Sequence, residues 1–200
     1  IRIFLSSTFS DMQETRNYLT KKIFPKIEKE CTDRGVRFTV LDLRWGITES
    51  ESKTGKVIEI CIDEINRTRP FFIGLVGDRY GWIPDEEEMR RNRHLEEKYP
   101  WVREYMKRGA SITEIEMQYG VLDSGLPVDA FFFLKEEHGS TGAAGSRSEK
   151  EVKLAALKAK IRKKAAEGVC SADTYSSIEQ LGQLVHERLM TMIDSKFPAD

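Results

Sequence analysis

The chain has 200 residues, with 32 Lys and Arg, 33 Asp and Glu, and a formal net charge of -1. This length suits one domain with a core of several layers. The balanced charge excludes a global basic field for nucleic acid or an acidic membrane surface, and no apolar run approaches the roughly 20 residues of a membrane span.

The strands and helices alternate from one end of the chain to the other. The predicted strands lie at 1–7, 36–46, 70–78 and 128–136 and near Val169 and Cys170. The predicted helices lie at 10–33, 56–67, 111–122, 149–168 and 176–197. Such alternation is typical of βαβ units, so we predict a single three-layer α/β domain over 1–200 with a central, mainly parallel sheet of about five strands.

Several local signals set the expected boundaries of the helices. Ser10 with Gln13 forms a capping-box pattern at the start of the first helix, and Pro25 should kink that helix. Ser176 with Glu179 is the same pattern before the last helix. The helix that begins near 150 has a basic outer face, which is either a solvated surface or a docking patch.

Two segments do not fit the alternation. The charged stretch at 85–110 carries Trp101 and Tyr105 among Arg, Lys and Glu, which indicates a partly helical insertion long enough to be a lid. The Gly- and Ser-rich segment at 138–149 is expected to be a flexible loop.

The three cysteines, Cys31, Cys61 and Cys170, are odd in number and lack the spacing of a metal site. They predict a reducing compartment, which we take to be the cytoplasm, with thiols in or near the core. The sequence begins at Ile1, without Met and inside a strand pattern. We therefore expect a piece of a longer multidomain polypeptide.

Candidate binding residues follow from the rule that open parallel sheets bind ligands at the carboxyl ends of their strands, where the strand order reverses. The residues after the first three strands are Ser6, Ser7, Thr8 and Phe9, then Arg44, Trp45 and Gly46, then Asp78, Arg79, Tyr80 and Trp82. Hydroxyls at a helix start suit a phosphate, and an aromatic ring beside Arg suits a flat, charged ligand. The structural alternatives are a helix cap at Ser6–Thr8 and an ion pair between Arg44 and Asp78.

The stretch "SITEIEMQYG" at 111–120 holds two glutamates that cannot share one role, since two residues on a helix lie about 200° apart. If Ser111 is the N-cap, Glu114 completes a capping box by returning to the Ser111 backbone N–H. Glu116 has no capping role and lies at the edge of the apolar stripe, beside Gly120. It is therefore the candidate catalytic group, with an ion pair to Arg44 or Arg79 as the structural alternative.

Four motifs in order, "IRIFLSSTFSDMQETRNYL", "DLRWGITESE", "FFIGLVGDRYGWIP" and "SITEIE", carry a family resemblance. Residues 1–135 resemble the uncharacterised N-terminal module upstream of NACHT/STAND NTPases with WD40 or tetratricopeptide repeats, as in telomerase-associated and nephrocystin-type proteins. That module is similar to Toll/interleukin-1 receptor (TIR) domains, which have a flavodoxin-like fold. The chain departs from TIR domains by its long insertion and by the absence of a Trp just before the glutamate.

The TIR resemblance implies an NAD glycohydrolase, activated by oligomerisation, in innate immune signalling. Its catalytic residue would be Glu116, with Glu114 as the second choice. It implies NAD as a substrate, no required cofactor and no metal. The alternative is a non-catalytic adaptor that associates with itself or with partner domains. Nucleic-acid binding rests only on the basic residues from Lys150 to Lys164, and we expect neither nucleic acid nor a membrane as a partner.

Overall fold

The computed structural model describes residues 1–43, 56–85, 87, 93–136 and 148–199. Its centre is a five-stranded sheet in the order β2-β1-β3-β4-β5, and every neighbouring pair of strands is parallel. The strands are β1 (Arg2–Ser6), β2 (Thr39–Leu41), β3 (Phe71–Val76), β4 (Asp129–Lys135) and β5 (Ser171–Tyr175). The predicted α/β fold is confirmed, and this strand order is the flavodoxin-like one.

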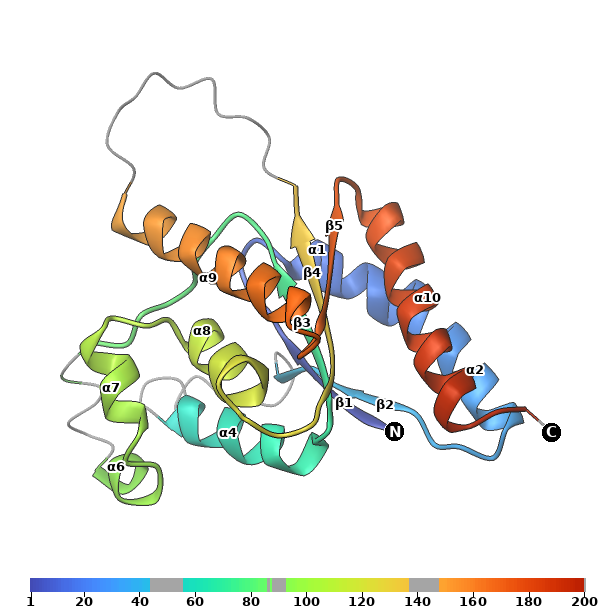
Figure 1. Cartoon of the computed structure of the whole chain (residues 1–200), viewed down its shortest axis with the longest axis horizontal. Helices are drawn as coiled ribbons and strands as arrows, with labels where there is room; N and C mark the ends of the chain where they lie inside the picture. The colour runs from blue at the N-terminus through green and yellow to red at the C-terminus, as the bar shows by residue number, and fades with distance from the viewer. Residues whose placement is uncertain (44–55, 86, 88–92, 137–147, 200) are drawn as a thin grey trace.

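Helices cover both faces of the sheet, as Figure 1 shows. One face carries α4 (Lys56–Thr68), α8 (Ile112–Met117), the π-helical turn η3 (Gln118–Leu122) and α9 (Glu149–Ala166). The other face carries α1 (Gln13–Tyr18), the π-helical turn η1 (Leu19–Ile23), α2 (Phe24–Asp33) and α10 (Ile178–Lys196).

The strand side chains alternate between two hydrophobic cores, because successive residues of a strand point to opposite faces. Phe4 and Phe72 pack in the core under α4, α8 and α9. Ile3 and Ile73 pack in the core under α2 and α10. The central strands are therefore buried on both sides, which explains the uninterrupted apolar run of β3.

The first helical segment differs from its prediction at the start and in the middle. Helix α1 begins at Gln13 after Met12 and has no side-chain cap, and the Ser10 hydroxyl instead accepts a hydrogen bond from Arg79 at 3.3 Å. The predicted irregularity at Pro25 takes the form of the π-helical turn η1, which ends just before Phe24. Because Pro25 has no backbone N–H, a regular α-helical ladder cannot continue through it.

The starts of the two C-terminal helices differ slightly from the predictions for the last helix and for the loop before α9. The N-cap of α10 is Ser177, whose side chain accepts from the Gln180 backbone N–H, so the predicted Ser176 cap is wrong. Helix α9 begins at Glu149, the last residue of the predicted loop at 138–149, because Ser148 and Glu151 form a capping box that was not predicted. Residues 138–147 of that loop lie outside the described residues.

Not all of the basic side chains of helix α9 are exposed to solvent. Lys158 is only 2% exposed and donates to the backbone oxygen of Lys135 at 3.4 Å. Val152, near the start of the helix, is 54% exposed although it is apolar. The packing stripe consists of Leu154, Leu157 and Ile161.

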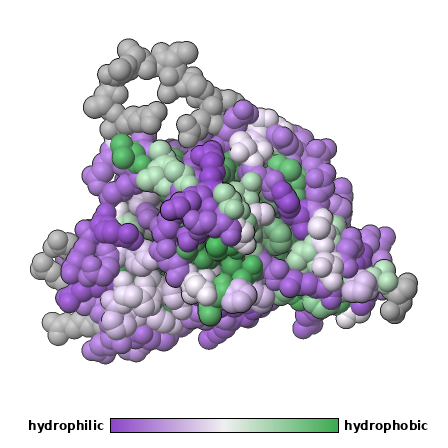
Figure 2. All heavy atoms as spheres, in the orientation of Figure 1, coloured by the Kyte–Doolittle hydropathy of each residue, from purple (hydrophilic) through white to green (hydrophobic). Residues whose placement is uncertain are grey.

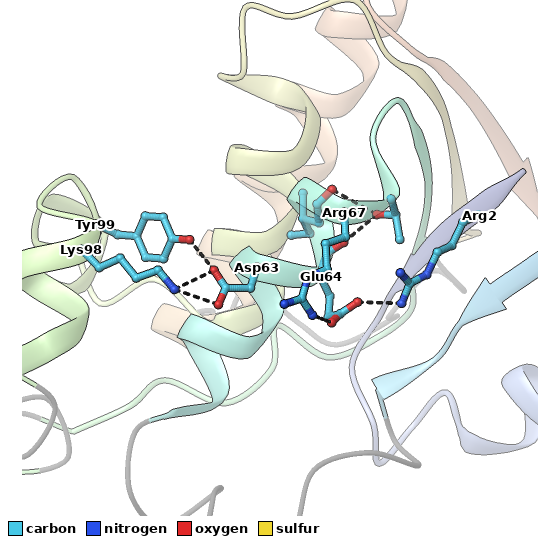
Figure 3. A network of polar contacts seen from close by, with 8 residues as sticks. Arg2, Asp63, Glu64, Arg67, Lys98 and Tyr99 are labelled. Carbon is cyan, nitrogen blue, oxygen red and sulfur yellow. Dashed lines mark hydrogen bonds and ion pairs between the residues drawn. The ribbon is translucent and has the colours of Figure 1, made fainter.

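The insertion at 85–110 contains α6 (Arg93–Lys98) and α7 (Val102–Lys107), in agreement with its predicted helical character. Figure 3 shows Lys98 and Tyr99 meeting Asp63 of α4, with the Lys98 Nζ to Asp63 Oδ2 distance at 2.8 Å. The Trp101 ring stacks on the Tyr119 ring of η3, with centroids 4.6 Å apart. The insertion is thus fastened to the helical layer, and a lid role stays a prediction.

Helix α4 is also tied to the first residue of β1, an inner strand of the sheet. The Glu64 carboxylate accepts from Arg2 of β1 at 2.9 Å and from Arg67 at 2.5 Å, as Figure 3 shows. Because these ion pairs are partly exposed, each contributes little to the free energy of unfolding, about 0–1 kcal/mol. Their consequence is geometric, since they restrain the helix that carries Cys61.

The surface in Figure 2 is mainly hydrophilic, with small hydrophobic patches near the centre of the view. Among the described residues, no helix has the length and apolar composition needed to cross a membrane.

Candidate functional site

A pocket of about 650 Å³ lies at the carboxyl ends of β1 and β3, where the strand order reverses. Its volume is in the range of small-molecule sites. It is formed by the segments after β1 and after β3 and by the first turns of α4, α8 and α9. The lining residues are Ser7, Thr8, Phe9, Ser10, Val57, Asp78, Arg79, Tyr80, Gly81, Trp82, Ile112, Thr113, Glu116, Lys150, Glu151 and Leu154.

Most predicted site residues meet in this pocket. Ser7, Thr8, Phe9, Asp78, Arg79, Tyr80, Trp82 and Glu116 line it, whereas Arg44, Trp45 and Gly46 lie outside the described residues. Ser6 lies just behind the wall, fully buried, and contacts Glu116. No residue from the described part of 85–110 lines the pocket.

Glu116 is the buried carboxylate of the pocket, with only 7% of its surface exposed. The Ser6 hydroxyl at the end of β1 donates to Glu116 Oε2 at 2.5 Å, and the Cys61 thiol of α4 donates a second hydrogen bond. Burial raises the pKa of Glu116, while the hydrogen bonds from Cys61 and Ser6 and the charge of Arg16 act in the opposite direction. The carboxylate is therefore held in one orientation by donors from two other elements.

Cys61 is a donor in this arrangement and not a nucleophile. It is 2% exposed, and both burial and the neighbouring Glu116 carboxylate raise its pKa well above the ordinary value for a thiol. A raised pKa keeps the thiol protonated at neutral pH, and only the protonated thiol can donate to Glu116. The prediction that Cys61 lies in the core is confirmed.

Arg16 holds the turn that follows β1. It is 1% exposed, pairs with Asp42 just after β2, and donates to the Ser7 hydroxyl at 2.5 Å and to the Ser7 backbone oxygen at 3.0 Å. Its guanidinium also lies 5.2 Å from the centre of the Phe9 ring. Arg16 was not among the predicted site residues, because one Arg on an amphipathic helix gives no sign that it points inward.

Glu114 serves a different cluster from Glu116. Ser111 is the N-cap of α8 and accepts from the Glu114 backbone N–H at 3.1 Å, as predicted. The Glu114 carboxylate, however, does not return to the Ser111 backbone: it accepts from the Tyr80 hydroxyl and from Gln118 at 3.1 Å. Glu114 lines a separate pocket of about 300 Å³. The predicted capping box is thus only half formed, because the Glu114 carboxylate binds the Tyr80 hydroxyl instead of the Ser111 backbone N–H.

Tyr80 belongs to both pockets but offers little ring surface to a ligand. It is 3% exposed, and burial together with the hydrogen bond to Glu114 raises its pKa. Phe9 and Trp82 line the same pocket with 49% and 43% of their surface exposed. These two rings, and not Tyr80, are the aromatic surfaces accessible to a ligand among the described residues.

The wall that α9 contributes to the pocket was not predicted. Lys150, Glu151 and Leu154 line the pocket although about 70 residues separate them from β3. The Ser-x-x-Glu pattern at 148–151 could have predicted where α9 begins, but no local signal says which side of the sheet it meets. Within the described part of the chain, no group of three or more His, Cys, Asp and Glu could hold a metal ion.

Comparisons with known proteins add a family and a set of much longer relatives. The family model described as Domain of unknown function (DUF4062) matches residues 2–190. A TPR repeat-containing protein of Dictyostelium discoideum is 30% identical over the whole chain, which covers 12% of that protein. Telomerase protein component 1 of Mus musculus is 35% identical over 58% of the chain and 4% of its own length.

A third relative is named for its NACHT domain and WD repeats. NACHT and WD repeat domain-containing protein 2 of Homo sapiens is 35% identical over 44% of the chain and 6% of its own length. The chain therefore spans only a small part of each of these relatives. No solved structure matches the chain.

Proposed function

From the premise that this chain belongs to the family described as Domain of unknown function (DUF4062), we propose that it is a signalling or effector module of a larger NACHT-containing protein. The support is its similarity to short parts of long proteins named for NACHT domains and WD or TPR repeats. In this proposal, oligomerisation of the adjoining NTPase brings copies of the module together.

We further propose that the pocket cleaves the N-glycosidic bond of an NAD-type dinucleotide, as a TIR-like enzyme would. The observation that carries this proposal is Glu116, a buried carboxylate that lines the pocket at the strand-order reversal and is held by Ser6 and Cys61. Buried, oriented carboxylates with perturbed pKa values cluster at catalytic sites.

The chemistry needs little more than this carboxylate. The bond between the nicotinamide nitrogen and C1′ of the ribose breaks, and nicotinamide leaves with the electron pair. Water then adds to C1′ and loses a proton, which gives ADP-ribose. The ionised Glu116 would stabilise the positive charge that develops on the ribose. Hydrogen bonds from Ser6 and Cys61 favour that ionised form.

The test is release of nicotinamide from NAD by the purified chain, both free and clustered on an oligomeric scaffold. Glu116→Gln should reduce the rate by about 100-fold or more, as removal of one charge-stabilising group does in other enzymes. Glu114→Gln is the matched control, since it removes a carboxylate from the same helix outside the pocket. Absence of nicotinamide even from the clustered protein, or equal losses in both variants, would refute the catalytic proposal.

A non-catalytic self-association module is the second candidate. It is favoured by four large hydrophobic side chains that are well exposed among the described residues: Phe9, Trp82, Leu126 and Val152. Under this alternative, Trp82→Ser would weaken self-association, measured by light scattering, while Glu116→Gln would leave both association and signalling unchanged.

A further inference from the structure

The acidic and basic side chains that line the large pocket differ in whether they already have a partner within the protein. Each carboxylate already has a partner within the protein. Asp78 pairs with Lys135, Glu151 accepts from the Ser148 backbone N–H at 2.6 Å, and Glu116 accepts from Ser6 at 2.5 Å. The negative charges of the pocket are therefore compensated by contacts inside the fold.

The two basic side chains of the pocket, Arg79 and Lys150, have fewer contacts within the protein. Arg79 follows β3, is exposed, and donates to the neutral hydroxyl of Ser10 at 3.3 Å. Lys150 in the first turn of α9 is exposed, and its ammonium forms no ion pair with any residue that the structure describes. The next lysine, Lys153, pairs with Glu149 and caps the backbone oxygens of 108 and 109. Lys150 is thus the α9 lysine that lines the pocket and is available to a ligand.

The rest of the pocket lining consists of a buried apolar wall and two exposed aromatic rings. Val57, Ile112 and Leu154 form an apolar part of the wall and are buried. Phe9 and Trp82 present exposed rings. A pocket that combines flat rings, an apolar wall and two cations is complementary to a ligand with an aromatic base and an anionic group.

We propose that Arg79 and Lys150 form an anion subsite that binds the phosphates of the ligand, so that the pocket selects phosphorylated nucleotides over nucleosides. Helix α9 is then part of the binding site, and its position matters for substrate recognition. This inference deepens the proposed NAD-cleaving function and rests on it for the identity of the nucleotide. The Phe9 and Trp82 rings would contact the base, while the two cations compensate the phosphate charge.

The test is calorimetric binding of two probes to the purified chain, ADP-ribose and adenosine, at low ionic strength. ADP-ribose should bind at least tenfold more tightly than adenosine. Arg79→Gln and Lys150→Gln should each weaken ADP-ribose binding by about tenfold, the typical worth of a charge-assisted contact, and leave adenosine binding unchanged. Raising the salt concentration should reduce the difference between the probes, since exposed charges are screened.

Lys163→Gln is the matched control, because it removes the same charge from the far end of α9, where the side chain is 77% exposed. Equal affinity for the two probes, no binding of ADP-ribose, or equal effects of Lys150→Gln and Lys163→Gln would overturn the anion subsite.

The binding test does not depend on catalysis, because ADP-ribose lacks the nicotinamide bond. If the expected binding pattern occurs without nicotinamide release, the catalytic proposal fails and the subsite stands. If nicotinamide is released at the same rate and KM by Lys150→Gln and by the wild-type chain, the subsite fails and the catalytic proposal stands.

Discussion

Among the described glycines, Gly74 in the middle of β3 is the one where an added methyl group would make the closest contact with a neighbouring side chain. It pairs with Phe132 of β4, and both residues face the core under α8. The Phe132 ring is completely buried and lies across the backbone of Gly74. We predict that Gly74→Ala destabilises the domain, although alanine is generally better than glycine inside a strand.

The magnitude follows from the contacts. A Cβ at position 74 would lie 2.5 Å from two ring carbons of Phe132, whereas ordinary contacts begin at 3.4 Å, so the ring must retreat by roughly 1 Å. The ring is completely buried, with the Phe72 ring at a centroid distance of 6.0 Å, so little free space is left for this movement. Overpacking of this kind costs about 1–3 kcal/mol, and replacing glycine in a strand returns about 0.5–1 kcal/mol. We expect a net loss of about 1–2 kcal/mol.

Urea denaturation followed by circular dichroism measures this loss, and Tm should fall by about 2–4 °C for each kcal/mol. Phe132→Leu provides the control, because a smaller side chain makes room for the added methyl group. The double variant should lose less stability than the sum of the two single variants. Unchanged or increased stability of Gly74→Ala, or strict additivity in the double variant, would refute the packing argument.

Two further predictions concern the site and the insertion. The pKa of Glu116 is raised by burial, so its favourable contribution to stability is complete below the ordinary glutamate pKa of about 4.3 and is lost as the pH rises through the raised value in the folded state. Glu116→Gln should therefore be more stable than the wild-type chain at pH 8 and lose that advantage toward pH 4. Urea denaturation across this pH range measures the difference in stability between the two proteins. A difference that does not change with pH would contradict the raised pKa of Glu116 in the folded state. Trp101→Ala removes the stack on Tyr119 and the edge contact with Tyr105, and should cost about 1–3 kcal/mol. Limited proteolysis should then cut the insertion faster than in Trp101→Phe, and equal cleavage of the two variants would show that the stack does not hold it.

The fold was predictable because its signals are local and repeated. Apolar runs that alternate with helical periodicity predicted a parallel sheet with helices on both faces, and the described strands follow that pattern. The strand-end rule then placed Ser7 and Asp78 near one another, and both line the same pocket as Glu116. The helical angle between Glu114 and Glu116 also predicted that the two carboxylates face different surroundings, as their separate pockets show.

Partners that come from distant segments could not be predicted in this way. Periodicity indicates whether a side chain is buried, but it does not identify the atoms that it meets. Thus Glu114 has the sequence of a capping box, yet its carboxylate binds the Tyr80 hydroxyl. Arg16 looks like a surface residue and is the buried support of the turn after β1.

The sequence by itself determined the order of the elements, the class of the sheet and the edge of the sheet where a site would form. Only the tertiary structure decided that Cys61 and Ser6 hold Glu116, and that α9 brings Lys150 to the pocket. The physical reason is the range of the forces involved. Backbone geometry and hydrophobic periodicity act within a few residues, whereas hydrogen bonds and charge pairs across the fold depend on how whole helices pack against the sheet.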